Sequence, residues 1–186
     1  MNAARRCAMA CWPMTRDANT LRARLARQDD AAAIAEIYNQ GIEDRVGTFE
    51  TEPRSPVQIA RWFDAGRPIV VAEDPAGVVV GFAASAAYRD RACYAGIAEF
   101  SVYVRRDWRR HGAGRVALSA LIEAAAAAGL WKLVSRVFPE NAASRALLHR
   151  LGFREVGTYQ RHGQLDGIWR DCVIVERLLA GPGTAS

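Results

Sequence analysis

The spacing of apolar positions changes repeatedly along the chain between the period of a strand and that of a helix. Residues 21–25 alternate apolar and basic side chains, which predicts a short strand. An Ala/Ile-rich segment with helical spacing follows from Asp29-Asp30 to Asn39. Ser55-Pro56 supplies an N-cap and a first-turn proline, which predicts a second helix through Phe63.

The centre of the chain predicts three strands. The runs 68–73 and 77–86 are rich in β-branched and small apolar residues, and the segment 74–77 between them has turn chemistry. Together they predict an antiparallel hairpin. A third strand is expected from about residue 94 to residue 104.

The second half of the chain continues the alternation. It predicts an Ala-rich helix over 112–128 that ends at Gly129, a strand over 131–138 and a helix from Pro139 to Leu151. Two further strands are expected over 153–159 and 169–178. The order β-α-α-β-β-β-α-β-α-β-β predicts one mixed α/β (α+β) layer structure without internal repeats.

Length and composition agree with a single globular domain. The 186 residues are 51% hydrophobic and 24% charged, against a usual domain length of roughly 150 residues. We expect a domain over 21–179, a flexible tail over 1–20 and a short tail over 180–186. No run approaches the ~18 apolar residues that span a bilayer. The 25 basic and 20 acidic residues give a net charge of +5, which suits an anionic ligand.

The N-terminus superficially resembles a signal peptide. Its apolar run after Arg5-Arg6 stops at Pro13, so we expect neither export nor lipidation of Cys11; Met14 is an alternative start of translation, which leaves open whether residues 1–13 are genuine. We therefore expect a cytoplasmic protein with four free thiols, in which Cys93 and Cys172 are small core residues. The cysteine spacing indicates no metal site.

The turn between the third strand and the Ala-rich helix has the composition of an anion site. Gly112 and Gly114 remove side chains from the first helical turn, whose N–H groups and dipole attract an anion, and Arg109 and Arg110 add full charges. The spacing matches neither a dinucleotide fingerprint nor a P-loop. A solvated basic loop is the alternative interpretation.

Three motifs give the chain a family resemblance. Val104 with Arg109, Gly112 and Gly114 between strand and helix, followed by the segments 140–144 (Glu-Asn-Ala-Ala-Ser) and 151–157 (Leu-Gly-Phe-Arg-Glu-Val-Gly), resembles the GNAT acetyltransferases. The resemblance covers about residues 21–179. It implies a GNAT-like mixed, mostly antiparallel central sheet with helices on both faces, and acetyl-CoA as the acetyl donor without a metal.

A closer resemblance is to the phosphinothricin-type amino-acid N-acetyltransferases, including those that act on arsinothricin. It rests on Tyr38-Asn39, on the segment 48–50 (Thr-Phe-Glu), on the segment 88–94 (Tyr-Arg-Asp-Arg-Ala-Cys-Tyr) and on the segment 99–104 (Glu-Phe-Ser-Val-Tyr-Val). The resemblance implies acetylation of small acidic amino acids such as phosphinothricin, arsinothricin or methionine sulfoximine. It also implies resistance by detoxification and a homodimer with Thr48-Phe49 near the partner.

The resemblance assigns two sets of binding residues. The cofactor would lie against Val102, Tyr103, Val104, Arg109, Arg110, His111, Gly112, Ala113, Gly114, Arg115, Asn141 and Ser144. The acidic substrate would lie against Phe49, Arg89, Arg91, Tyr94, Ser101 and Tyr103. A main-chain N–H near Val102 would stabilise the oxyanion of the transition state.

Glu99 is the expected general base, because an α-ammonium must lose a proton before it attacks an acyl group. Strand alternation places Glu99, Ser101 and Tyr103 on one face and Phe100 and Val102 on the other, unless a bulge intervenes. The alternative is that Glu99 only pairs with an arginine.

Arg89 and Arg91 are two residues apart, so in an extended segment both would face a carboxylate or phosphinate. Surface solvation is their alternative role. Asn141 also suits a helix N-cap. His149 stands one position after the place where the subgroup often has a histidine, so we leave it outside the site together with the side chains of His111 and His162.

The sequence is also compatible with three other functions. The chain could acetylate a protein N-terminus or another amine, although paired arginines disfavour a polyamine. It could bind CoA without turnover. From a different class, the basic run 105–111 with Trp108 could bind nucleic acid by stacking on a base, but this run is short, and we expect no nucleic-acid partner and no membrane association.

Overall fold

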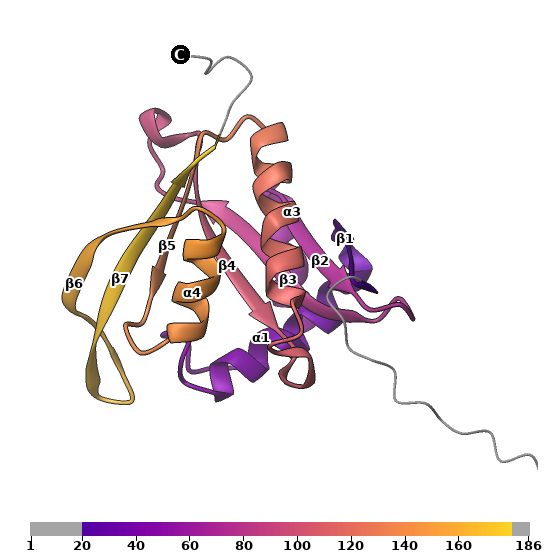
Figure 1. Ribbon diagram of the computed structural model, residues 1–186, viewed down its shortest axis with the longest axis horizontal. Helices are drawn as coiled ribbons and strands as arrows, with labels where there is room; N and C mark the ends of the chain where they lie inside the picture. The colour runs from indigo at the N-terminus through magenta and orange to yellow at the C-terminus, as the bar shows by residue number, and fades with distance from the viewer. Residues whose placement is uncertain (1–19, 180–186) are drawn as a thin grey trace, which may run out of the picture.

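The computed structural model describes residues 20–179, which form one seven-stranded sheet with the strand order β1-β2-β3-β4-β5-β7-β6 (Figure 1). The strands are β1 (Arg22–Leu25), β2 (Ile69–Glu73), β3 (Val79–Ala87), β4 (Ile97–Val104), β5 (Lys132–Val137), β6 (Arg154–Leu165) and β7 (Ile168–Leu178). Strands β4 and β5 are parallel, and the other neighbouring pairs are antiparallel. The predicted mixed, mostly antiparallel sheet is confirmed.

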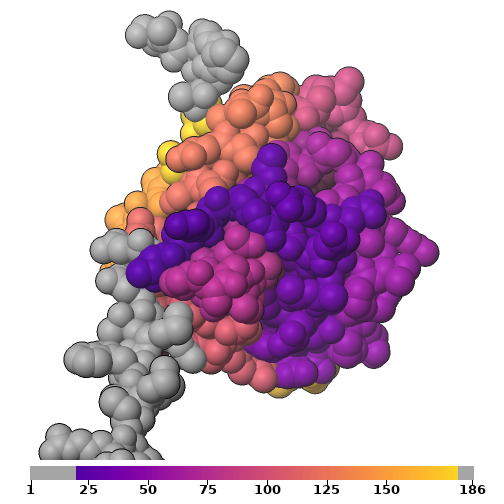
Figure 2. Space-filling model, turned by 90° about the vertical axis from the view of Figure 1, so that its right-hand side faces the viewer, coloured from indigo at the N-terminus to yellow at the C-terminus, as the bar shows by residue number. Residues whose placement is uncertain are grey.

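Helices cover both faces of the sheet, as predicted. They are α1 (Ala31–Glu43), α2 (Pro56–Ala60), α3 (Ala113–Ala127) and α4 (Ala142–Arg150). Two apolar clusters fill the layers. The first joins the sheet to α3 and α4 through residues such as Leu118, Leu133 and Leu148, and the second joins it to α1 through Ile34 and Phe82. Figure 2 shows the side of the molecule where the N-terminal third, indigo to purple, forms much of the surface.

Some element boundaries differ from the predicted ones. The second helix is α-helical only to Ala60 and continues as a 3-10 turn, Arg61–Ala65, that ends at Gly66 with a φ of 62°. Strand β4 begins at Ile97, because residues 92–94 form another 3-10 turn. Strand β6 continues to Leu165, well beyond the predicted end at 159, because it forms a hairpin with β7.

The hairpin of β6 and β7 forms the edge of the sheet and is drawn at the left of Figure 1. The β6–β7 register shifts between Glu155 and Gly157 and again between Tyr159 and Gly163. Its outer surface exposes large apolar side chains, including Tyr159 and Trp169. Such a surface is unusual for a long edge strand that has no partner.

The cysteine predictions have a mixed outcome. Cys172 is buried and Cys93 is exposed, and both thiols are free. The prediction that Cys93 belongs to the core is therefore wrong, because it lies in the 3-10 turn before β4 and not in a strand. Cys7 and Cys11 lie outside the described residues, as do almost all of both predicted tails.

Gly41 allows α1 to approach β4 closely, which yields a test of this packing. A Cβ atom built on Gly41 would lie 2.5 Å from a ring carbon of Tyr103. We predict that Gly41→Ala lowers the free energy of unfolding by about 1–3 kcal/mol, because the overpacked ring must move. Urea denaturation measures this change, with the exposed Glu36→Ala in the same helix as control. Equal stability of Gly41→Ala and wild type would contradict the packing argument.

Candidate active site

A large cleft opens where β4 and β5 separate. The two strands pair only from Ile97 with Lys132 to Glu99 with Val134. Just beyond this point the Ser135 hydroxyl donates a 2.8 Å hydrogen bond to the carbonyl oxygen of Phe100. The cleft has a volume of about 1300 Å³. Its lining includes most of the residues expected from the sequence: Phe49, Glu99, Ser101, Val102, Tyr103, Val104, Arg109, Arg110, Gly112, Gly114, Arg115, Asn141 and Ser144.

Five expected site residues do not line the cleft. Ala113 is the first residue of α3 and is buried in the core, and the His111 ring lies 6.2 Å from that of Trp108. The other three, Arg89, Arg91 and Tyr94, belong to the segment between β3 and β4. Their roles in binding stay predictions, although the backbone of residues 111–113 belongs to the turn that borders the cleft.

The segment that contains Arg89 and Arg91 is not extended. The Arg91 amide donates to the carbonyl oxygen of Arg89 at 3.0 Å, which closes a tight turn. The Arg89 guanidinium carbon lies 5.3 Å from the ring centre of Tyr88, and that of Arg91 lies 5.8 Å from the ring centre of Tyr94. The geometric premise that both arginines share one face of an extended segment is therefore wrong.

The N-terminus of α3 faces the cleft with its backbone exposed. The N-cap residue is Gly112, with a φ of 87°, and no side chain caps the helix. A positive φ of this size favours glycine, and Arg110 also lies in the left-handed region at 66°. The first N–H groups of α3 therefore keep their hydrogen-bonding capacity for an external acceptor, and the helix dipole favours an anion there.

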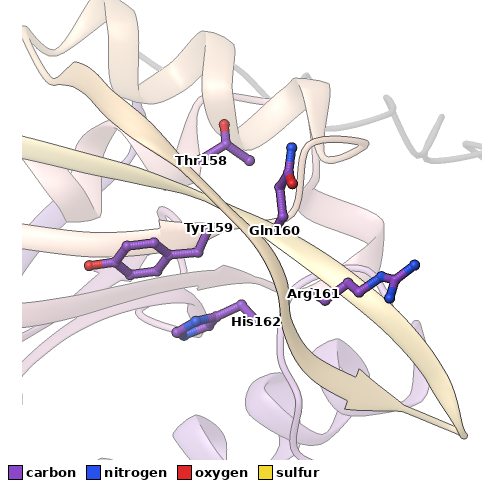
Figure 3. A pocket seen from close by; sticks show the side chains of 5 residues that line it. All are labelled: Thr158, Tyr159, Gln160, Arg161 and His162. Atoms are coloured by element: carbon purple, nitrogen blue, oxygen red, sulfur yellow. The ribbon is translucent and has the colours of Figure 1, made fainter.

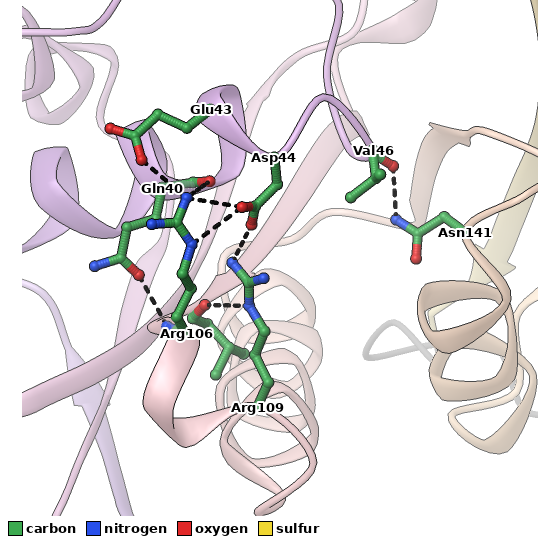
Figure 4. A network of polar contacts seen from close by, with 8 residues as sticks. Gln40, Glu43, Asp44, Val46, Arg106, Arg109 and Asn141 are labelled. Carbon is green, nitrogen blue, oxygen red and sulfur yellow. Dashed lines mark hydrogen bonds and ion pairs between the residues drawn. The ribbon is translucent and has the colours of Figure 1, made fainter.

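Acidic side chains at the end of α1 hold two arginines of this turn (Figure 4). Asp44 lies 2.7 Å from an Arg106 nitrogen and 2.5 Å from an Arg109 nitrogen, and Glu43 pairs with Arg106 at 2.8 Å. Burial opposes ionisation of Asp44, but hydrogen bonds from Arg106 and Arg109 outweigh it and hold the pKa of Asp44 below its ordinary value. Asp44 therefore fixes the turn to α1 while Arg110 stays outside the network.

Side chains alternate along β4 without a bulge. Phe100 is buried in the cluster beneath α3 and α4, and Val102 and Val104 pack against that cluster. Tyr103 packs on the opposite side, against α1. The edge of β4 that faces β5 has no strand partner after Glu99, so its main-chain groups border the cleft.

Glu99 and Arg136 form an ion pair inside the cleft. The carboxylate comes from β4 and the guanidinium from β5. The pairing that the sequence left as an alternative for Glu99 is thus present. The sequence did not predict Arg136 as a site residue. It lies in a short strand, and the alternation of residues there does not reveal which neighbouring side chain it faces.

Tyr103 is packed rather than exposed at the site. Its ring lies 4.8 Å from that of Tyr38 and 5.5 Å from that of Phe82, and its hydroxyl donates to the Gly47 carbonyl oxygen at 3.4 Å. Burial raises the pKa of Tyr103 far above its ordinary value. The phenol therefore remains protonated at neutral pH and cannot serve as a base.

His162 lines the cleft, although sequence reasoning left it out of the site. The β6 irregularity turns its ring toward the same side as that of Tyr159, as Figure 3 shows, and the two rings stack at 5.0 Å. Arg161 within the irregularity has a φ of 47°. Phe49 lies 6.4 Å from the His162 ring and 4.9 Å from the Phe138 ring. A bulge of this kind has no clear sequence signal.

Asn141 is the N-cap of α4, as its alternative role predicted. Its side-chain oxygen accepts from the Ser144 amide at 3.1 Å. Its side-chain nitrogen donates to the Val46 carbonyl oxygen at 3.1 Å, which bridges the cleft to the segment after α1 (Figure 4). His149 is exposed and does not line the cleft.

The basic run before α3 is poorly suited to nucleic acid. Trp108 is 5% exposed and belongs to the core, so its ring cannot stack on a base. Arg105 pairs with Asp107, and Arg106 and Arg109 pair with Asp44. These contacts neutralise most of the charge that a phosphate backbone would require.

Residues 20–179 show neither a metal centre nor a membrane-spanning helix. No cluster of three His, Cys, Asp or Glu side chains there is arranged to hold a metal ion. Within the same range, no helix combines the length and the apolar character needed to cross a bilayer.

Residues 31–153 match the acetyltransferase (GNAT) family. The chain is 38% identical over 151 residues to the L-methionine sulfoximine/L-methionine sulfone acetyltransferase of Pseudomonas paraeruginosa, covering 79% of this chain and 88% of the relative. It is 32% identical over 158 residues to the phosphinothricin N-acetyltransferase of Streptomyces coelicolor, covering 82% of this chain and 92% of that relative. The crystal structure of a GNAT superfamily phosphinothricin acetyltransferase from Sinorhizobium meliloti with acetyl-CoA is similar at a TM-score of 0.82, with 33% identity and 90% and 92% coverage.

The Asp44 network predicts a pH-dependent contribution to stability. Because the folded-state pKa of Asp44 is lowered, its ionised form stabilises the fold above the ordinary carboxylate pKa of about 3.9, and this contribution is lost as the pH falls through the lower folded value. We predict that Asp44→Asn lowers the free energy of unfolding by about 1 kcal/mol at pH 6.

Urea denaturation of both proteins from pH 6 to pH 3 measures this contribution, with the exposed Asp64→Asn as control. The difference between wild type and Asp44→Asn should shrink below about pH 4. A difference that is as large at pH 3 as at pH 6 would exclude the ionised Asp44 as its source.

Proposed function

Because the chain belongs to the acetyltransferase (GNAT) family, we propose that it transfers acetyl from acetyl-CoA to the α-amine of a small acidic amino acid. Candidate substrates are the acidic phosphinothricin and arsinothricin, and also methionine sulfoximine, whose side group is uncharged; acetylation would detoxify all three. The relatives named for methionine sulfoximine and phosphinothricin support these two substrates. Arsinothricin is included because it is the arsenic analogue of phosphinothricin.

The observation that carries the proposal is the position of Glu99. Its carboxylate lies where β4 and β5 part, in the same cleft as the glycine-lined start of α3. An anionic carrier bound at α3 can follow the unpaired edge of β4 toward Glu99. The cleft thus joins an anion site to a carboxylate that can accept a proton.

The residues at the start of α3 suit the diphosphate of acetyl-CoA. The N–H groups of residues 113–115 and the guanidinium of Arg110 would bind its oxygens. Gly114 lets α3 pack closely against β4 and α4, since a Cβ atom there would lie 3.2 Å from Leu147 and 3.3 Å from Val104. Val102, Tyr103 and Val104 would present backbone groups to the pantetheine arm, and Asn141 and Ser144 would border it from α4.

Glu99 supplies the base in this mechanism. Bound acetyl-CoA supplies a thioester, an activated acyl group that an uncharged amine can attack. The substrate α-ammonium must first lose its proton, and Glu99 accepts it. The main-chain N–H near Val102 would then stabilise the negative oxygen that forms during attack. As the amide forms, the carbon–sulfur bond would break, and the CoA thiolate would leave and take up the second proton that the nitrogen loses. Ser101 lines the cleft on the same face as Glu99 and would contact the substrate.

The proposal includes a homodimer formed through the hairpin of β6 and β7. Its exposed large apolar side chains include Val156, Tyr159, Ile168 and Trp169, which are 49–58% exposed. Strand β6 is an edge strand and presents unpaired main-chain groups next to them. A second copy of the chain would cover both features. We also propose that the enzyme acts in the cytoplasm, where the free thiols of Cys93 and Cys172 would stay reduced.

Thiol release from acetyl-CoA across a panel of phosphinothricin, methionine sulfoximine, arsinothricin and ordinary amino acids tests the function. We predict that Glu99→Gln lowers kcat by roughly 10²–10⁴-fold, because the proton acceptor is lost, and that acetyl-CoA affinity is retained. The matched control is the exposed Glu123→Gln on α3, which should keep full activity. An unchanged kcat in Glu99→Gln would remove Glu99 as the base, and no turnover of any amino acid would refute the function.

The dimer is tested by the molar mass in solution. We predict that wild type has twice the chain mass and that Trp169→Glu shifts it toward one chain mass, because a buried charge destabilises an apolar interface. Light scattering after size exclusion measures both. Val57→Glu, an exposed apolar position on α2, should leave the mass unchanged. A monomeric wild type at high concentration would rule out this assembly.

A further inference from the structure

The ion pair between Arg136 and Glu99 has a definite place in the sheet. Glu99 is paired with Val134 across β4 and β5, and Arg136 lies two residues farther along β5. Alternation along a strand places Arg136 on the same face as Val134, and therefore on the same face as Glu99. The side chains of Arg136 and Glu99 are 44% and 32% exposed. Both charges are thus accessible from the cleft.

Arg136 has no role in the function proposed above. Five arginines line the cleft within the described residues: Arg109, Arg110, Arg115, Arg136 and Arg150. Three of them come from the segment 109–115 around the start of α3, and Arg150 ends α4. Arg136 is the one bonded to Glu99. The positive charge nearest the proposed base is therefore on β5, and not on the predicted Arg89 or Arg91.

The pair is complementary to a zwitterion. A free amino acid carries an ammonium and a carboxylate on the same carbon atom, so its two charges are as close to each other as those of a contact ion pair. When such a molecule enters, Glu99 can pair with the ammonium while Arg136 pairs with the carboxylate. One ion pair is exchanged for two, and the net charge of the site is conserved.

The exchange meets little resistance. An ion pair whose members are about a third and nearly half exposed contributes little stability, so breaking it is not costly. The planar guanidinium can bind a carboxylate through two parallel hydrogen bonds. An amine without a neighbouring carboxylate would leave the Arg136 charge unmatched if it took Glu99 away.

We propose that Arg136 binds the α-carboxylate of the amino-acid substrate and thereby releases Glu99 to receive the α-ammonium proton. This inference rests on the function proposed above. It makes Arg136 the residue that selects free amino acids. Polyamines lack the carboxylate, and in a protein N-terminus that group is an amide.

The test compares an amino acid with its own α-carboxamide in wild type and in Arg136→Gln. Methionine sulfone is the amino acid used, because its side group is uncharged and contributes no second anion. We expect Arg136→Gln to lower kcat/KM for methionine sulfone by about 10–100-fold, mainly through KM, since a hydrogen bond to a charged group is lost. For the carboxamide, kcat/KM of Arg136→Gln should differ from that of wild type by less than about threefold. Differences in amine basicity cancel, because each substrate is compared with itself.

Three further measurements make the result specific. Arg136→Lys should recover part of the loss, because it restores a point charge without the planar fork. Arg154→Gln removes an ion-paired arginine of β6 that does not line the cleft, and it should leave both substrates unchanged. The acetyl-CoA dissociation constant of Arg136→Gln should match that of wild type, which shows that the fold and the donor site are intact.

The outcomes separate this inference from the proposed function. An equal loss of kcat/KM for the amino acid and its carboxamide would mean that Arg136 acts only through Glu99, and it would overturn carboxylate binding. Unchanged kinetics for both substrates would also overturn it, while amino-acid turnover by wild type would leave the proposed function standing. A wild-type enzyme that acetylates the carboxamide better than every free amino acid would overturn both.

Discussion

The parallel pairing of β4 and β5 ends after Glu99 and Val134, and the rest of the site depends on that separation. If the two strands stayed paired, the main-chain groups of β4 would form hydrogen bonds with β5 and the cleft would close. Instead Ser135 uses its hydroxyl to hold the Phe100 carbonyl where the ladder ends. The parting strands leave a cleft that is lined by Glu99 and Arg136 and also by the start of α3. A backbone feature therefore positions both charged groups.

The sequence predicted the parts of this arrangement that follow from local chemistry. The glycines at 112 and 114 lie between a strand and a long helix, and this context indicates a helix start without side chains over its first N–H groups. The alternation along β4 indicates which side chains share a face, and the structure has no bulge there to disturb it. The element order was likewise readable, since each change of period coincides with a turn or cap signal.

The remaining parts depend on long-range geometry that no local pattern contains. Arg136 faces Glu99 only because β5 pairs in one particular register, which the sequence does not specify. His162 reaches the cleft through an irregularity in β6. Arg89 and Arg91 would share a face only in an extended segment, and the backbone forms a tight turn at 89–91 instead. Cleft-lining residues were thus predicted best along β4 and at the start of α3, and worst where strand register or an irregular backbone decides.

The two ends of the cleft differ in the kind of group that they offer. At α3 the donors are mainly backbone N–H groups, which depend on glycine and on helix geometry, and Asp44 anchors the turn by binding Arg106 and Arg109. At the opposite end the groups are side chains from separate elements, namely Glu99, Arg136 and Ser101. Backbone donors tolerate most changes in sequence, whereas each side chain can be replaced by one mutation. In the proposed function, the α3 end therefore suits one constant carrier, and the end at Glu99 would be able to change specificity without disturbing the fold.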